Sequence, residues 1–200
     1  MSHLKDLKMI KTKADLKQYL EEDRKNYPAL LNFAGRLRSA LFSTPIGIMI
    51  PQYKYLYYLR KAEFAINSKS KFKKILYLYF LRKMSYKTGF QIPPNVLGPG
   101  VTLFHFGMIV INGKVRIGRN AKFQPNVVIG KKTPNGGVPI IGDNFYVCAG
   151  ARIYGDITIG NNVRIGPNCC LYKSVPDNCV VVGNPAVIVK KDGEKCRINL

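Results

Sequence analysis

One apolar residue recurs at every sixth position through much of the second half of the chain. Neither the 3.6-residue period of a helix nor the strict alternation of a strand returns the same residue type at this spacing. A period of six is typical of a parallel β-helix, in which short strands wind into a coil and each turn buries its anchors against the next. A β-sandwich with accidental spacing is the alternative. The anchors are Ile117, Phe123, Ile129, Ile141, Val147, Ile153, Ile159, Ile165 and Leu171.

The repeat is interrupted once before it ends. The anchor due at position 135 is Asn135, and its neighbours are threonine, proline and glycine, which a buried strand does not use. We therefore expect residues 131–139 to loop outward from the coil. Prolines and glycines beyond the last anchor end the repeat, and we expect residues 176–200 to form a cap and a basic tail over the open end.

The first part of the chain has helical periodicity instead. Apolar residues are spaced for one helix face in residues 4–26, and helices are also expected at 28–41, 53–67 and 70–87. The last two are basic and rich in Tyr, Phe and Leu. Residues 39–53 carry no charge, but they include prolines and are too short to span a bilayer. We expect a buried connection there, with contact to a membrane as the alternative.

A breaker-rich segment, GFQIPP, separates the helices from the strands. In the helical part Arg60 and Glu63 stand three positions apart, which is the spacing of an ion pair on a helix surface. The expected organisation is a helical region, a β-helix and a cap, at residues 1–88, 89–175 and 176–200.

The chain is strongly basic, with 32 Lys and Arg against 11 Asp and Glu and a formal net charge of +21. The first hundred residues carry 19 basic and 6 acidic side chains and the second hundred 13 and 5, so the excess is spread. Zinc-finger spacing, a basic region leading into heptads and the aromatic RNP pattern are all missing, so we expect no nucleic-acid partner. An anionic ligand such as coenzyme A, or a membrane surface touched by the basic helices, explains the charge.

All five cysteines lie in the second half, without a CxxC pair. Two occupy positions of the repeat where small apolar residues belong, so we expect them to fill space and not to react. The segment from Met1 to Lys13 alternates charged and apolar residues and lacks the apolar core of a signal peptide. We therefore expect a cytoplasmic protein.

Three features together resemble the hexapeptide-repeat acyltransferases: the repeat, the segment GVTLFHFGMIVING and the closing SVPDNCVVVGNPAVIV. The chain is similar to serine O-acetyltransferases and to the O-acetyltransferases of capsule and exopolysaccharide synthesis, over about residues 52–190. The resemblance implies a β protein with an α-helical N-terminal part and a left-handed parallel β-helix. It also implies a homotrimer, with a dimer of trimers left open, and acetyl-CoA bound in the groove between subunits.

The resemblance identifies His105, one of two histidines, as the catalytic histidine. From the residues alone, a lone histidine between apolar neighbours is read as a buried structural side chain. Transfer of an acetyl group from a thioester to a hydroxyl requires removal of the hydroxyl proton, and histidine is an effective base near neutral pH. Asn112, Asn126, Phe104 and Tyr154 are candidates for stabilising the oxyanion or binding the acceptor.

The resemblance also indicates residues for acetyl-CoA. Ala149 and Pro167 stand where family members contact the pantetheine arm through the backbone, although proline has no N–H to donate. Tyr172, Lys173 and Lys190 are candidates for the adenosine and the phosphates, and the alternative for each lysine is a solvated surface charge. We expect no metal, because a metal-dependent relative would need about three histidines.

Three positions depart from serine acetyltransferases. The aspartate that orients the catalytic histidine is replaced by Phe90, with Gln91 beside it, and the acid directly before the histidine by Phe104. Val138 stands where those enzymes carry a second histidine that contacts serine. We therefore expect an acetyl-CoA-dependent O-acetyltransferase acting on a sugar hydroxyl of a surface polysaccharide or its precursor. The alternatives are a serine O-acetyltransferase and a non-catalytic trimeric scaffold.

Overall fold

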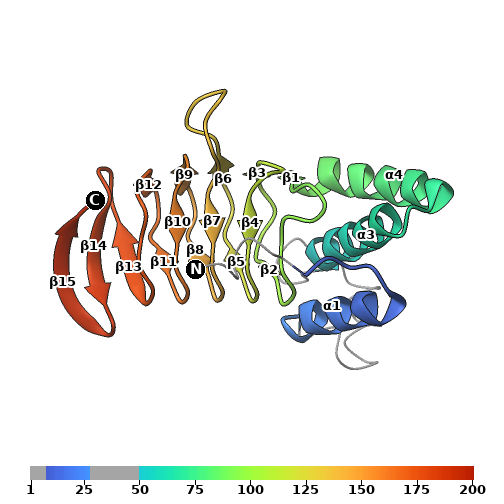
Figure 1. Ribbon diagram of the computed structural model, residues 1–200, viewed down its shortest axis with the longest axis horizontal. Helices are drawn as coiled ribbons and strands as arrows, with labels where there is room; N and C mark the ends of the chain where they lie inside the picture. Colours follow the sequence, from blue (N-terminus) through green and yellow to red (C-terminus); the bar gives the residue numbers. More distant parts are fainter. Residues whose placement is uncertain (1–7, 28–49) are drawn as a thin grey trace.

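The computed structural model describes residues 8–27 and 50–200. Three helices stand at one end of a long coil of short strands, and antiparallel strands close the other end (Figure 1). The helix expected at 28–41, and all but the last residues of the connection expected at 39–53, lie outside the described residues.

The coil is built from three sheets of stacked parallel strands. One sheet has the order β1-β3-β6-β9-β12 and another β4-β7-β10. The third runs β2-β5-β8-β11-β13 and continues into the antiparallel strands β14 and β15. The fold is therefore the predicted left-handed parallel β-helix. The strands are β1 Phe90–Gln91, β2 Thr102–Leu103, β3 Ile109–Ile111, β4 Arg116–Ile117, β5 Lys122–Phe123, β6 Val127–Gly130, β7 Ile140–Ile141, β8 Tyr146–Val147, β9 Arg152–Tyr154, β10 Thr158–Ile159, β11 Arg164–Ile165, β12 Cys170–Leu171, β13 Cys179–Val182, β14 Val187–Lys191 and β15 Glu194–Asn199.

The core of the coil consists of the residues that set the period. Every anchor of the repeat is buried, and so are six smaller side chains that follow an anchor four residues later: Ala121, Val127, Ala151, Ile157, Val163 and Cys169. Each strand from β4 to β12 carries one anchor inward and the residue before it outward, because successive side chains of a strand point to opposite faces. Cys169 belongs to this core, and burial raises the pKa of its thiol to about 11, which fits the predicted filling role.

A column of asparagines along one corner was not anticipated from the sequence. Asn120, Asn144, Asn162 and Asn178 each adopt the left-handed conformation, with φ between 56° and 58°. The side-chain amides of the first three each donate to the Oδ1 of the asparagine in the next turn, at 2.8 to 3.0 Å, and that of Asn178 donates to Oδ1 of Asp192 at 2.9 Å. Asparagine tolerates this conformation better than other residues with a Cβ, so one residue type satisfies both the turn and the stacking.

Three helices precede the coil in the described part of the chain: α1 Lys13–Lys25, α3 Ile50–Asn67 and α4 Lys71–Thr88. The expected helix at 4–26 starts later, at Lys13, because Thr12 and Asp15 form a reciprocal capping box there. The last residues of the expected connection at 39–53 are the first turn of α3 instead. Pro51 suits that turn, since the missing N–H is not needed at a helix start.

The ion pair expected on a helix surface is in fact buried. The Arg60 side chain is fully buried between Glu63, at 3.0 Å, and Asp23 of α1, at 2.8 Å. It also donates to the carbonyls of Leu97 and Gly98 in the first turn of the coil, at 2.8 and 2.6 Å. Burial alone would lower the pKa of Arg60, but the two carboxylates raise it above its usual range. The cluster therefore closes the N-terminal end of the solenoid.

The chain between β6 and β7 projects from the coil (Figure 1). This projection comprises residues 131–139, which contain no strand. At the far end β14 and β15 add two antiparallel strands to the sheet of the coil. Within residues 8–27 and 50–200, no helix has the length and apolarity needed to cross a membrane.

Candidate active site

His105 lies in the turn that joins β2 to β3, at the corner between two sheets of the coil. This first corner consists of residues 104–108 and the corresponding turns 124–126, 148–151 and 166–169. The imidazole is exposed, and among the described residues no group forms a hydrogen bond or an ion pair with it. Of the two interpretations of a lone histidine, the buried structural side chain does not apply here.

Three elements hold this turn in place. Gln52 of α3, itself buried, donates from Nε2 to the carbonyl of Phe104 at 3.4 Å. The Leu103 N–H donates to the hydroxyl of Tyr27 at 3.0 Å. The Gly107 N–H donates to the carbonyl of Thr88, the last residue of α4, at 3.1 Å. The helices therefore position the segment on both sides of the histidine.

A glycine closes the turn for a geometric reason. Gly107 has φ of +131°, and a Cβ at this position would lie 3.0 Å from Cβ of Pro125 in the next turn. Phe106 and Met108 flank it with exposed side chains. The corner therefore presents the histidine between apolar groups that are open to a ligand or to another subunit.

Three of the predicted site residues lie along the first corner, in successive turns beyond His105. The Asn168 N–H donates to the carbonyl of Ala149 at 2.9 Å, and the Gly150 N–H to that of Pro125 at 3.1 Å. From His105 to Pro167 the corner crosses three strand spacings, about 15 Å, along a continuous edge. The predicted residues on this edge are Asn126, Ala149 and Pro167.

Two of these three already have partners within the chain. Arg152 binds both the backbone carbonyl and Oδ1 of Asn126, the latter at 3.2 Å. The Ala149 N–H donates to Oε1 of Gln124 at 3.1 Å. A ligand that accepts a hydrogen bond from Ala149 therefore has to displace this side chain.

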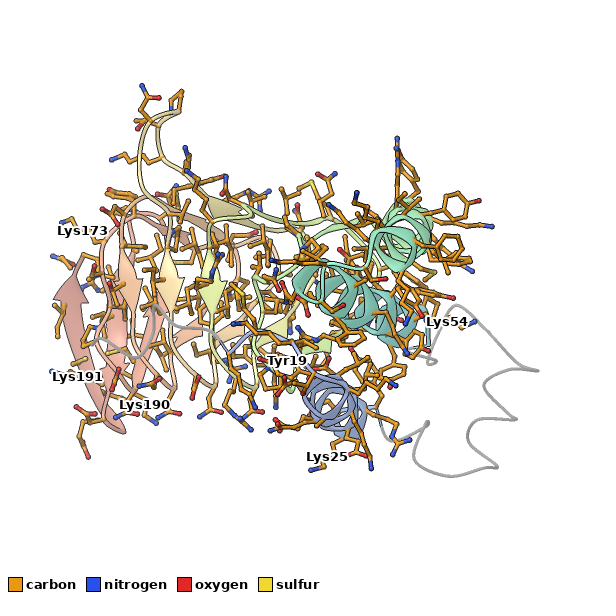
Figure 2. The ribbon with its side chains drawn as sticks, turned by 45° about the vertical axis from the view of Figure 1, so that its right-hand side comes forward. Tyr19, Lys25, Lys54, Lys173, Lys190 and Lys191 are labelled. Atoms are coloured by element: carbon orange, nitrogen blue, oxygen red, sulfur yellow. The ribbon has the colours of Figure 1, made fainter. Side chains whose placement is uncertain are left out.

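Phe104 directly precedes His105 on the first corner, and the other predicted residues lie elsewhere on the coil. Asn112 and Tyr154 are in register on the second corner, which follows β3, β6, β9 and β12, and Tyr172 and Lys173 follow at the end of the same corner. The Oδ1 of Asn112 accepts from the Lys114 N–H at 3.0 Å. Lys132 of the projecting loop lies 4.9 Å above the ring of Tyr172. Lys190 lies on β14, and with Lys173 it marks the end of the coil remote from the helices (Figure 2).

In the polar and aromatic group beside His105, Phe104 was predicted from the sequence, whereas Gln124, Tyr146 and Arg164 were missed. The ring of Phe104 lies 6.0 Å from that of Tyr146, whose hydroxyl accepts from Nε2 of Gln124 at 2.8 Å. The guanidinium of Arg164 stands 4.5 Å above the Tyr146 ring. The outward-facing residues of the strands do not repeat one residue type along the sequence. These side chains therefore become neighbours only through the stacking of the turns in the folded coil.

The arrangement at the first corner suits general-base chemistry. An exposed imidazole at a fixed turn can accept a proton from a bound hydroxyl, and no carboxylate among the described residues contacts it. Within the described residues, no three His, Cys, Asp or Glu side chains are grouped so as to hold a metal ion.

The sequence comparisons with known proteins find a transferase family with hexapeptide repeats and serine acetyltransferases. Residues 139–173 match the family described as bacterial transferase hexapeptide (six repeats). The chain is 37% identical over 111 residues to a serine acetyltransferase of Staphylococcus xylosus, which covers 54% of this chain. It is 38% identical over 109 residues to that of Staphylococcus aureus (strain N315), which covers 53% of this chain. The chain spans 51% of each of these relatives, or about half their length.

The structural matches to solved proteins cover the N-terminal helices as well as the coil. The soybean serine acetyltransferase apoenzyme matches 87% of this chain and 69% of its own, with a TM-score of 0.70 and 24% identity. The Neisseria gonorrhoeae serine acetyltransferase matches 92% of this chain and 67% of its own, with a TM-score of 0.68 and 24% identity. The structural likeness confirms the fold, and the sequence matches confirm the resemblance to serine acetyltransferases.

Proposed function

We propose that this protein is an acetyl-CoA-dependent O-acetyltransferase of the serine acetyltransferase type, with His105 as its general base. The observation that carries the proposal is the exposed imidazole at one end of the first corner, which has no partner within residues 8–27 and 50–200 and whose turn is held by α3, α4 and Tyr27. The sequence relatives are serine acetyltransferases, which supports the same reaction class.

His105 acts on the hydroxyl of the acceptor. One imidazole nitrogen takes the hydroxyl proton while the oxygen attacks the carbonyl carbon of the acetyl thioester. The resulting tetrahedral oxyanion collapses, the carbon–sulfur bond breaks, and the CoA thiolate receives the proton from the imidazolium. The products are the acetyl ester and CoA with a free thiol.

The first corner is the proposed place for the extended arm of acetyl-CoA. Ala149 and Pro167 line it beyond His105, and Gln124 exchanges its bond to the Ala149 N–H for a ligand contact. The pantetheine arm then runs along the turns, away from the helices. Tyr172, Lys173 and Lys190 are proposed to meet the adenosine and the phosphates, since all three lie exposed toward the far end.

We propose a homotrimer as the active form. Within one chain the first and second corners are separated by the sheet β1-β3-β6-β9-β12, so Asn112 and Tyr154 do not share a corner with His105. In a trimer the second corner and the projecting loop of one subunit face the first corner of its neighbour. Asn112 and Tyr154 would then contribute acceptor or oxyanion contacts from the adjacent subunit.

L-serine is the acceptor that the comparisons favour, in place of the sugar hydroxyl expected from the sequence. A sugar acceptor stays a second candidate because of one residue. Val138, which replaces the serine-contacting histidine, is half-buried and packs against the core of the coil, so its side chain provides no polar contact. The two candidate acceptors predict different results in the same assay, namely turnover with L-serine or turnover with a sugar.

The test measures thiol release from acetyl-CoA by the purified protein with L-serine, and separately with a panel of monosaccharides and nucleotide sugars. We expect turnover with L-serine and a loss of about 10²- to 10⁴-fold in His105→Ala. The variant should keep its melting temperature and its calorimetric affinity for acetyl-CoA, because the imidazole is exposed and unpaired. Turnover with a sugar but not with L-serine would make the sugar hydroxyl the acceptor. Undiminished activity of His105→Ala would refute the mechanism, and failure to bind acetyl-CoA would leave the scaffold interpretation.

A further inference from the structure

Helix α4 carries a stripe of exposed apolar and aromatic side chains along its outer face. The most exposed are Phe72, Ile75, Tyr79 and Tyr86, with 78, 71, 60 and 76% of their surface accessible, and Leu76 is exposed beside them. At 3.6 residues per turn these five positions fall within an arc of about 100°. Single exposed apolar residues are ordinary, whereas a contiguous stripe marks a binding surface.

Among the described residues, nothing packs closely over the stripe, and other residues hold α4 onto the protein. The opposite side of the helix carries the buried residues Leu81 and Thr88, and the ring of Phe80 stacks on that of Tyr58 in α3 at 5.1 Å. The helix ends at Gly89, which adopts the left-handed conformation with φ of 81°. In both views α4 lies on the outside of the helical end (Figures 1 and 2), and Figure 2 shows side chains of this helix projecting away from the coil.

Cations border the stripe on both sides. Lys71 and Arg82 lie along one edge, Lys73 and Lys87 along the other, and Lys83 falls within the stripe. With Lys74 the helix carries six basic side chains and no acidic one. An apolar face bordered by Lys and Arg is typical of a helix that lies in the plane of a membrane surface. Tyr79 and Tyr86 suit the headgroup level, and Lys83 can extend its ammonium group to the phosphates.

We propose that α4 docks this protein on an anionic lipid bilayer. Its apolar stripe enters the boundary between headgroups and acyl chains, and its cations contact lipid phosphates. A second copy of the chain is a poor occupant, because pairing two such helices would place six cations against six cations. A bilayer with negative headgroups supplies the opposite charge and the apolar layer together. This inference does not depend on the acetyl transfer or on its acceptor.

The charge contribution is tested by sedimentation of the full chain with vesicles of phosphatidylcholine alone and with vesicles that contain phosphatidylglycerol. We expect binding only to the anionic vesicles, weakening as salt is added. Lys71→Gln/Lys83→Gln/Lys87→Gln should weaken partitioning by about 100-fold. The matched control, Lys191→Gln/Lys195→Gln/Arg197→Gln, removes three exposed charges from β14 and β15 at the opposite end of the coil, and should change it by less than about threefold.

The apolar contribution is tested at constant charge. Phe72→Ser/Ile75→Ser should reduce affinity for anionic vesicles by about tenfold for each side chain, whereas Ile198→Ser on β15 should leave it unchanged. Equal losses in the two charge variants would overturn the proposal, because binding would then follow net charge alone. So would a smaller assembly of Phe72→Ser/Ile75→Ser in light scattering, since another copy would then cover the stripe. Absence of vesicle binding by the unaltered chain refutes it outright.

Discussion

A buried amide on α3 contacts the turn that carries His105. Gln52 reaches the carbonyl of Phe104, directly before His105, while its own Oε1 has no hydrogen-bond partner among the described residues. An unpaired buried oxygen costs about 1–3 kcal/mol, which a purely structural residue would not need to bear. We therefore regard Gln52 as a positioning residue for the turn.

Replacing Gln52 by leucine distinguishes a role in positioning the turn of His105 from a role in stabilising the fold. The substitution removes a long hydrogen bond of 3.4 Å together with the unpaired oxygen, so the free energy of unfolding should change by less than about 1 kcal/mol. The loosened turn should lower kcat by about tenfold with little change in KM for acetyl-CoA. Urea denaturation and steady-state kinetics measure the two effects. A large loss of stability with normal kcat would make Gln52 a structural residue only.

The two residues differ in how far they could be predicted. His105 could be proposed as the catalytic base from the sequence because its neighbours, FHFGMIVIN, resemble a family motif that is contiguous in the chain. Gln52 reaches its partner across 52 positions, and nothing in the surrounding segment distinguishes it from a solvated glutamine. Contacts of that kind depend on how a helix packs on the coil, which periodicity does not encode.

At the scale of elements, the joint between the helices and the coil depends on one buried cluster. Asp23 accepts from Arg60 and from the N–H groups of Gly100 and Val101, at 2.8 and 2.9 Å. The i, i+3 spacing of Arg60 and Glu63 correctly predicted their pairing but not its burial. The third member stands on another helix, so the sequence offered no sign that the charges leave the solvent.

Two adjacent residues of α1 allow a matched test of this joint. Asp23→Ala leaves the buried Arg60 without its main partner and should destabilise the fold by about 3–5 kcal/mol. Glu22→Ala removes the neighbouring pair with Arg119, whose guanidinium side chain is 50% exposed, and should cost about 1 kcal/mol or less. Urea unfolding followed by circular dichroism compares them. Equal losses would show that helix α1, and not the buried cluster, sets the stability.

At the scale of the whole molecule, the period of six predicted the coil, because each anchor occupies the same place in the turn. The six-residue period could not show which corners lie in register, since that depends on how residues between anchors are distributed over the turns. The projecting loop is the clearest case, because it lengthens one turn without disturbing the strands beside it. Apart from Lys190 on β14, the predicted site residues therefore lie on two corners that one chain does not bring together.

A trimer would unite them, and its mass provides the test. Light scattering should give about three times the 22.5 kDa of one chain. Met108 is 42% exposed beside His105 and would be covered in the assembly, so Met108→Asp should dissociate the trimer and abolish thiol release together. Ile198→Asp, an equivalent change on the outermost strand, should preserve both mass and activity. An active monomer of the unaltered protein would show that the first corner alone completes the site, and that Asn112 and Tyr154 take no part in it.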